Sequence, residues 1–210
     1  NKSEGSGFTE DDKRLLSILA TQSAQVLETT RLYQQEQSLK VIQEQVRLAA
    51  VIQNDLLPKK FPAIPGYEIV GRSIPAQLVG GDYFDFIPLN NTKMAICVGD
   101  VSGKGFPASL LMANLQATLR GQCMVTASAR QCINHSNKLL FESTSSEKFA
   151  TLFYGLLDWE QHKFQFCNAG HDPPFHISYS GDQKRLSTGG IVLGIMNSFL
   201  YEEEAVPVSP

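Results

Sequence analysis

Val98-Gly99-Asp100-Val101-Ser102-Gly103-Lys104-Gly105 sets an aspartate at the end of a predicted strand and just before a predicted helix. An earlier stretch, Val79-Gly80-Gly81-Asp82-Tyr83-Phe84-Asp85, uses paired glycines to deliver a carboxylate to the head of another strand. Carboxylates presented at strand ends by glycine turns can converge on a hard cation such as Mg²⁺ or Mn²⁺. Gly-Asp turns are also common structural features, so each stretch taken alone is interpreted as a turn.

The stretch 98–105 matches a phosphate-binding P-loop only in part. Three residues, not four, separate Gly99 from Gly103, and Lys104 is followed by Gly105 instead of Ser or Thr. A Walker A loop needs the longer spacing to wrap the phosphates and the hydroxyl to hold its metal ion. This mismatch counts against an NTPase and against a nucleotide-binding switch.

In the sequence, segments typical of β-strands come before and after a pair of helical segments. The strands expected from alternation and turn residues are 67–74, 82–88, 93–99, 150–158, 163–168 and 174–178, with a short one at 183–187. The two helices expected between the third and fourth strands cover 107–122 and 127–142. This order predicts an antiparallel-rich sheet packed with helices, in an α/β or layered α+β class.

The chain before Pro58 is a long helical segment. Residues 1–7 are expected to form a loop, Thr9 can cap a helix with Asp12 three residues on, and no Gly or Pro follows until Pro58. A change of phase in the apolar pattern, or a division into two helices, is expected near 27–33. A heptad seam for a coiled coil is predicted over 32–56, with polar interruptions at Gln35 and Gln53. Its apolar members are Leu32, Leu39, Ile42, Val46, Ala49 and Leu56.

Two interpretations of this segment remain open. It forms either a helix between two subunits, which the unbroken length favours, or an amphipathic helix packed on its own domain. Gln53 either occupies the seam, where it would allow two near-equal arrangements, or faces solvent.

Composition narrows the class of protein. The chain has 210 residues, 42% of them apolar and 19% charged, with a net charge of −3 and scattered Lys and Arg, so no nucleic-acid surface is expected. No apolar run reaches membrane-span length and no signal pattern opens the chain, which predicts a cytoplasmic protein with no membrane insertion. The chain does not begin with Met, which suggests a piece of a longer protein. Cys97 and Cys167 lie in apolar runs and are expected to be buried free thiols.

Several stretches, in order across residues 49–210, resemble the SpoIIE/RsbU family of phosphatases. Residues 8–33 also resemble the terminal helix of a GAF-type sensor domain. The matching family stretches are 50–58 (AVIQNDLLP), 75–85 (PAQLVGGDYFD), 99–105 (GDVSGKG), 152–155 (LFYG), 168–171 (NAGH) with Pro173-Pro174, Gly189-Gly190 and Leu193-Gly194.

This resemblance implies a PPM-type phosphatase fold, a β-sandwich flanked by helices, over 58–210, after a helical linker over 1–57. It implies hydrolysis of phosphoserine or phosphothreonine by a metal-bound water, with Mn²⁺ or Mg²⁺ at a two-metal site and no phosphoenzyme. By the family pattern Asp100 bridges both metals, Asp82 holds one, and the Val101 carbonyl completes that site. Asp85 is expected to be an outer or structural residue.

Other residues near these motifs are ambiguous. Asn168 and His171 can act as a base and its partner, but a hydrogen-bonded brace of the turn is favoured. Asp172 stands where the family more often has Asn. Lys104 either attracts phosphate or is solvated. Ser102 is not expected to be a nucleophile.

The resemblance implies a role in bacterial partner-switching signalling, acting on a phosphorylated anti-sigma-factor antagonist of STAS type. Linker helices are predicted to pair two subunits into a homodimer. Family members continue past a segment like 206–210 to further metal-binding aspartates, so this fragment is expected to be metal-deficient and poorly active. The alternative function is a non-catalytic dimeric scaffold that binds its partner without hydrolysis.

Overall fold

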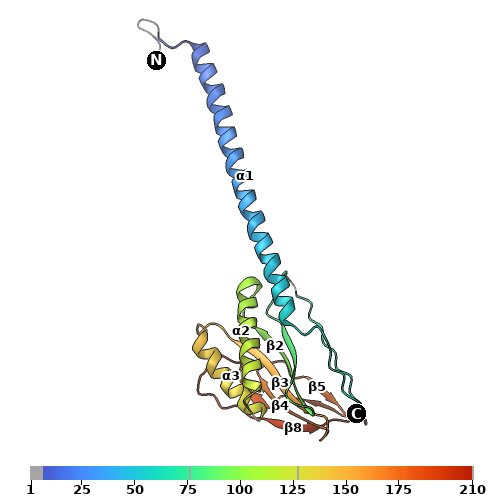
Figure 1. Ribbon diagram of the computed structural model, residues 1–210. Coiled ribbons are helices and arrows are strands. Elements are labelled where there is room, and N and C mark those ends of the chain that lie inside the picture. The colour runs from blue at the N-terminus through green and yellow to red at the C-terminus, as the bar shows by residue number, and fades with distance from the viewer. Residues whose placement is uncertain (1–6, 76, 127, 210) are drawn as a thin grey trace. The chain divides into compact units, whose positions relative to one another are not determined.

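The structure is a computed structural model that describes residues 7–75, 77–126 and 128–209, and it divides into a unit up to Arg47 and a unit from Leu48 onward (Figure 1). The loop expected at 1–7 lies outside the described residues except for Gly7. The boundary predicted between 57 and 58 stays a prediction. The helices are α1 (Glu10–Leu56), α2 (Gly105–Cys123) and α3 (Ala129–Ser143).

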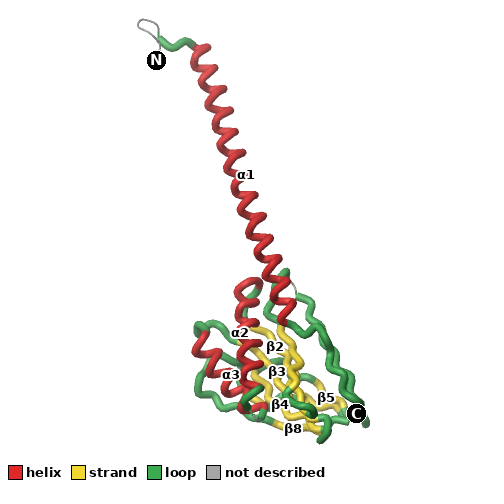
Figure 2. The backbone as a smooth tube through the Cα atoms, in the orientation of Figure 1, coloured by secondary structure: helices red, strands yellow, loops and turns green. Residues whose placement is uncertain are grey.

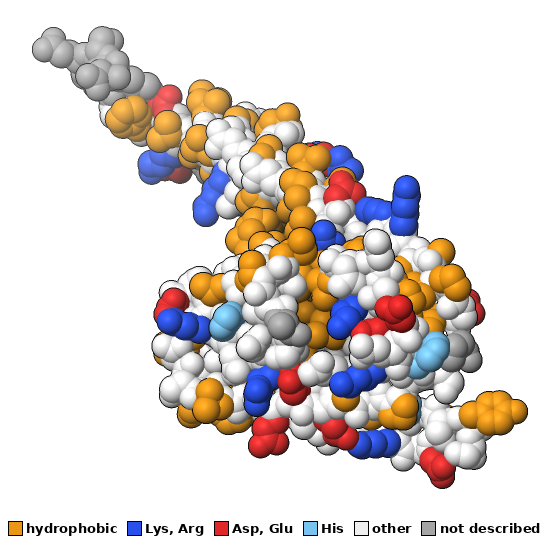
Figure 3. Space-filling view, turned by 60° about the horizontal axis from the view of Figure 1, so that its bottom comes forward, with side chains coloured by type: hydrophobic (Ala, Val, Ile, Leu, Met, Phe, Trp, Pro, Cys, Tyr) orange, Lys and Arg blue, Asp and Glu red, His pale blue; other side chains and the backbone are white. Residues whose placement is uncertain are grey.

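Helix α1 is one unbroken helix of 47 residues. Its start is a capping box, since the Asp12 amide donates to Thr9 Oγ1 at 3.2 Å and the Thr9 amide donates to Asp12 Oδ2 at 2.8 Å. The expectation of two helices near 27–33 is wrong, because strong helix formers continue through that stretch without Gly or Pro. No residue of α1 is fully buried, and apolar side chains stand exposed along it (Figure 3).

Two sheets form the rest of the second unit (Figure 2). In the described part of the chain the larger sheet has the order β1-β2-β3-β4-β7, with β8 also paired to β4, and β5 pairs only with β6. All pairs are antiparallel except β4 with β7. The strands are β1 (Tyr83–Pro88), β2 (Lys93–Val101), β3 (Ala150–Asp158), β4 (Lys163–Ala169), β5 (Phe175–Ile177), β6 (Gln183–Arg185), β7 (Gly189–Gly190) and β8 (Glu204–Pro207).

The main core lies between the larger sheet and the two helices α2 and α3. Side chains of α2 such as Met112 and Leu115, and of α3 such as Ile133 and Leu140, pack against inward residues of the strands. The expected mixed layering of helices and sheet is therefore confirmed. All four cysteines are free, buried members of this core, as expected for Cys97 and Cys167.

The opposite face of the sheet carries a smaller apolar cluster and the extended segment 64–75. The strand expected at 67–74 is wrong, since in this stretch only Tyr67 makes a bridge, to Ile64. The segment packs face-on through its side chains, and Gly71 lies so close to Phe84 that a Cβ there would come within 2.7 Å of the ring. Side-chain packing thus replaces the backbone pairing that an alternating pattern normally indicates.

No helix among the described residues has the length and apolarity that crossing a membrane requires.

Candidate functional site

Asp82 and Asp100 meet across two neighbouring strands. Tyr83 pairs with Gly99 in the antiparallel register of β1 and β2, so continuing that register by one residue sets Asp82 opposite Asp100. Side chains alternate between faces along a strand. Cys97 and Val101 of β2 face the helices, so Asp100 lies on the other face, where Asp82 also lies.

The two carboxylates line one hollow of about 380 Å³, together with Gly81, Gly103 and Lys104. They also line a second hollow of about 230 Å³, which includes His171. The residues singled out from sequence as the acidic pair therefore come together, on loops and strand ends that leave them open to solvent.

The Val101 carbonyl oxygen lies in the same site as the two carboxylates. A Cβ built on Gly81 would lie 2.7 Å from Asp100 Oδ1 and 2.9 Å from the Val101 carbonyl oxygen. Both oxygens therefore lie close to the place where a side chain of residue 81 would begin, and only glycine leaves room for them. A substitution at Gly81 would occupy the space toward which these two acceptor oxygens converge.

Electrostatics make this arrangement unfavourable when no cation is present. Partial burial raises the pKa of Asp100, and the negative charge of Asp82 raises it further. The backbone hydrogen bond with Val101 and the nearby His171 both lower the pKa of Asp100, by smaller amounts. A cation between the carboxylates would relieve this repulsion.

We expect Asp100→Asn to stabilise the metal-free chain at neutral pH. Because the folded-state pKa is raised, the ionised carboxylate destabilises the fold; this cost is fully present above the folded-state pKa and disappears as the pH falls below the unfolded-state value. Urea denaturation with EDTA at pH 7 and pH 3.5 would show a gain at pH 7 that shrinks in acid, with the exposed Asp182→Asn as control. Lower stability of Asp100→Asn at pH 7 would contradict this account.

Gln53 of α1 holds the turn that carries Asp82. Its side-chain amide donates to the Gly80 carbonyl at 2.6 Å and accepts from the Gly80 amide at 3.1 Å. Gln53 is partly buried and bonded to Gly80, so the solvent-facing position expected as one alternative is wrong, while its place in a coiled-coil seam stays a prediction. The heptad pattern missed this role because the partner lies 27 residues further along the chain.

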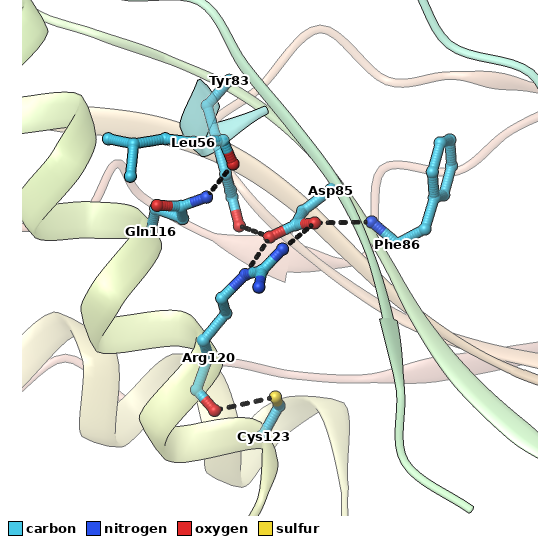
Figure 4. Close-up of polar contacts among 7 residues, drawn as sticks. All are labelled: Leu56, Tyr83, Asp85, Phe86, Gln116, Arg120 and Cys123. Carbon is cyan, nitrogen blue, oxygen red and sulfur yellow. Dashed lines mark hydrogen bonds and ion pairs between the residues drawn. The ribbon is translucent and has the colours of Figure 1, made fainter. Parts of the chain in front are cut away.

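Asp85 is a structural residue on the helix side of the sheet (Figure 4). It is fully buried and accepts two hydrogen bonds from Arg120 of α2, at 2.7 Å from Nε and 2.9 Å from Nη2. It also accepts from the Tyr83 hydroxyl at 3.0 Å and from the Phe86 amide at 2.9 Å. The bonds from Arg120 tie α2 to β1 three residues after Asp82, and the hydrogen bond with Asp85 raises the pKa of Arg120.

The same close-up shows a tie between two helices. The Gln116 amide of α2 donates to the Leu56 carbonyl at the end of α1 (Figure 4). This bond satisfies one of the carbonyls that a helix end leaves unpaired.

Asn168 braces the turn that carries His171. Its amide donates to the His171 carbonyl at 2.9 Å, and its Oδ1 accepts from the His171 amide at 2.8 Å. The His171 Nδ1 lies 2.9 Å from Thr151 Oγ1, which donates to the Asp100 carbonyl at 3.2 Å. Since that hydroxyl has one proton, Nδ1 must be the donor to it. Burial lowers the pKa of His171, so the neutral ring is favoured at neutral pH.

The donor atoms fit a hard divalent cation in kind. Two aspartates and one backbone carbonyl are the oxygen ligands that Mg²⁺ and Mn²⁺ prefer. In the described ranges no group of three or more His, Cys, Asp or Glu side chains is arranged to hold a metal ion, so these residues supply part of a ligand set. Ser102 Oγ accepts from the Phe149 amide at 3.0 Å, which gives it a structural task.

The chain is similar to a family model and to known proteins. The family model of stage II sporulation protein E (SpoIIE) matches residues 90–210. Phosphoserine phosphatase RsbU of Bacillus subtilis (strain 168) is 30% identical over 176 residues, which cover 81% of this chain and 52% of RsbU. The chain thus spans about half the length of that relative.

Solved structures are similar in fold. The RsbU and RsbW domains of Rv1364c from Mycobacterium tuberculosis match with a TM-score of 0.56 and 26% identity, over 64% of this chain and 38% of that one. The PP2C phosphatase domain of SpoIIE from Bacillus subtilis, solved with a fragment of its regulatory domain, matches with a TM-score of 0.56 and 22% identity, over 63% and 39%. The expected PPM-type architecture is therefore confirmed.

Proposed function

The chain belongs to the SpoIIE family, and on that premise we propose that the protein containing it is a metal-dependent phosphatase for phosphoserine or phosphothreonine in a protein. The observation that carries the proposal is the placement of Asp82 and Asp100 on facing strand ends, in one hollow on the face of the sheet away from α2 and α3. The name of the relative RsbU, a phosphoserine phosphatase, supports the choice of phosphoserine.

In the proposed reaction Asp82 and Asp100 hold Mn²⁺ or Mg²⁺, with the Val101 carbonyl as a further ligand. The chemistry that bound cations supply is activation of water as the nucleophile and neutralisation of charge on the phosphoryl oxygens. Gly81 keeps the approach to these oxygens open, and the Gln53 clamp fixes the turn before Asp82. The contact from His171 through Thr151 to the Asp100 backbone positions the end of β2.

The substrate proposed is a small phosphorylated anti-sigma-factor antagonist of STAS type in bacterial partner switching. The protein would act in the cytoplasm as a homodimer joined through α1. Support for the dimer comes from the many apolar side chains that α1 exposes. An isolated helix in water gains little stability from its own hydrogen bonds, so a partner helix along the predicted seam would stabilise it. Residues 8–33 would then be the end of a GAF-like sensor domain.

The experiment that tests this function is phosphate release from a phosphoserine protein by the full-length protein, with Mn²⁺, with Mg²⁺ and with excess EDTA. Release that requires the metal supports the proposal. If a folded, metal-supplied protein releases no phosphate but binds the phosphoprotein, and Asp100→Ala leaves that binding intact, the non-catalytic scaffold replaces it.

We expect Gln53→Ala to destabilise the chain by roughly 1–3 kcal/mol, because two hydrogen bonds of about 0.5–1.5 kcal/mol each are lost. It should also lower phosphatase activity, because the turn before Asp82 gains freedom. Gln53→Glu keeps the acceptor for the Gly80 amide but cannot donate to the Gly80 carbonyl, so its effects should be intermediate. Urea denaturation and phosphate release measure the two effects.

The matched control is Gln45→Ala, at an exposed glutamine of the same helix. Equal stability and activity of Gln53→Ala and Gln45→Ala would show that α1 does not position the Asp82 turn.

A further inference from the structure

Lys148 lies beside Gly103, in the loop that follows Asp100, although 45 positions separate the two residues in the sequence. It precedes β3, whose Ala150 pairs with Val101 at the end of β2. The pairing extends by one residue, because the Ser102 amide donates to the Phe149 carbonyl at 2.8 Å and the Phe149 amide donates to Ser102 Oγ at 3.0 Å. One residue further, the same antiparallel register sets Lys148 opposite Gly103.

The side chain of Lys148 extends over Gly103. Its Nζ is 3.9 Å from the position that a Cβ on Gly103 would take, and among the described residues no other heavy atom lies within 4 Å of that position, apart from the glycine and its two chain neighbours. Gly103 has a φ of +101° and lines the hollow that contains Asp82 and Asp100. The ammonium group therefore lies next to a residue that lines the proposed reaction site.

This ammonium group has no carboxylate partner among the described residues, although Lys148 is half-buried. A phosphate oxygen could supply the partner that this ammonium group lacks. The loop is nevertheless fixed: the Lys148 amide donates to the Ser145 carbonyl at 2.9 Å, and Phe149 is held by Ser102. The structure thus presents a positive charge on an ordered backbone next to a site for phosphate chemistry.

We propose that Lys148 binds the phosphate group of the phosphoprotein substrate. This inference rests on the proposed phosphatase function and names a residue for its substrate. A phosphomonoester is close to a dianion at neutral pH, and charge-assisted hydrogen bonds from ammonium to phosphate oxygens are among the stronger ones in proteins. Lys104 lines the hollow that contains Asp82 and Asp100 but is exposed, whereas Lys148 is half-buried.

The test compares Lys148→Ala and Lys148→Arg with wild type in the full-length protein, using a phosphoserine protein as substrate and inorganic phosphate as a competing product. Lys148→Ala should raise KM and the Ki of inorganic phosphate by roughly 10-fold or more, since a hydrogen bond to a charged group contributes about that factor. The value of kcat should change less, because a phosphate contact made equally in the bound substrate and the transition state acts on KM. Lys148→Arg keeps the charge and should recover most of the affinity.

Lys163→Ala is the control, because Lys163 is exposed and lies opposite Asp158 in the strand register, at the other end of β3. Lys148→Gln, which keeps the length of the stem, provides a second neutral variant if Lys148→Ala unfolds. Phosphate release with an unchanged Ki of inorganic phosphate in a folded neutral variant would overturn the role of Lys148 alone. Absence of metal-dependent release from the wild-type protein would instead contradict the proposed function.

Discussion

Asp100→Asn in the full-length protein is expected to lower metal-dependent phosphate release by more than about 100-fold, since removing even an outer partner of a metal ligand typically costs 10–100-fold. Asp100 is central to the site, because its Oδ1 lies close to Gly81 together with the Val101 carbonyl oxygen, and the charge of Asp82 raises its pKa. Asparagine keeps the size of the side chain but removes the charge that a cation requires.

The measurement is phosphate release at saturating Mn²⁺ with a phosphoserine protein. Asp182→Asn is the matched control, because Asp182 is exposed in the hairpin region between β5 and β6. The variant that loses activity should also be the one that gains stability without metal, which separates this outcome from simple unfolding. More than a tenth of wild-type activity in Asp100→Asn would remove Asp100 from the metal site.

Arg120→Ala is expected to destabilise the chain by about 3–5 kcal/mol, the usual cost of leaving a buried charge without its partner. The two partners differ in exposure: the Arg120 side chain is 50% exposed and Asp85 is 0% exposed. Loss of Arg120 leaves the Asp85 carboxylate buried, while loss of the Asp85 charge leaves a guanidinium that can reach water. Asp85→Asn should therefore cost less, about 1–2 kcal/mol for weakened hydrogen bonds.

Urea denaturation of this chain measures both variants, with Arg130→Ala on α3 as an exposed arginine control. The double variant Asp85→Asn/Arg120→Ala should be more stable than Arg120→Ala alone, because no buried charge remains. If Asp85→Asn is more destabilising than Arg120→Ala, the burial of the Asp85 charge does not determine the stability cost of breaking this pair.

Much of the larger sheet follows from sequence patterns. Glycine turns and alternating apolar residues located β1, β2, β3 and β4 to within about two residues, and the same turns indicated Asp82 and Asp100. The segment 67–74 alternates in the same way but is not a strand of either sheet. An alternating pattern indicates that one face of a segment packs against the core, and it does not indicate whether the backbone pairs with another strand. Which strands join is decided by contacts distant in sequence.

The residues around the site were harder to predict from the sequence. Asp85 could have been separated from Asp82 in advance, because residues three apart in a strand point to opposite faces. Its partner Arg120 lies 35 residues away on a helix, and no local pattern indicates it. Lys148 becomes visible only through the register of β2 with β3, which brings residues 45 positions apart side by side.

The buried cysteines have a practical consequence for spectroscopy. Burial raises the pKa of all four thiols, to about 11 for Cys123 and to about 12 for Cys167. Since the thiolate is the reactive form, alkylating probes at neutral pH should leave the native cysteines unlabelled while the core is closed. A single cysteine introduced at an exposed position of α1 would then carry a spin label or fluorophore against a silent background. The slow rate at which the native thiols are labelled would in turn measure how often the core beneath α2 and α3 opens.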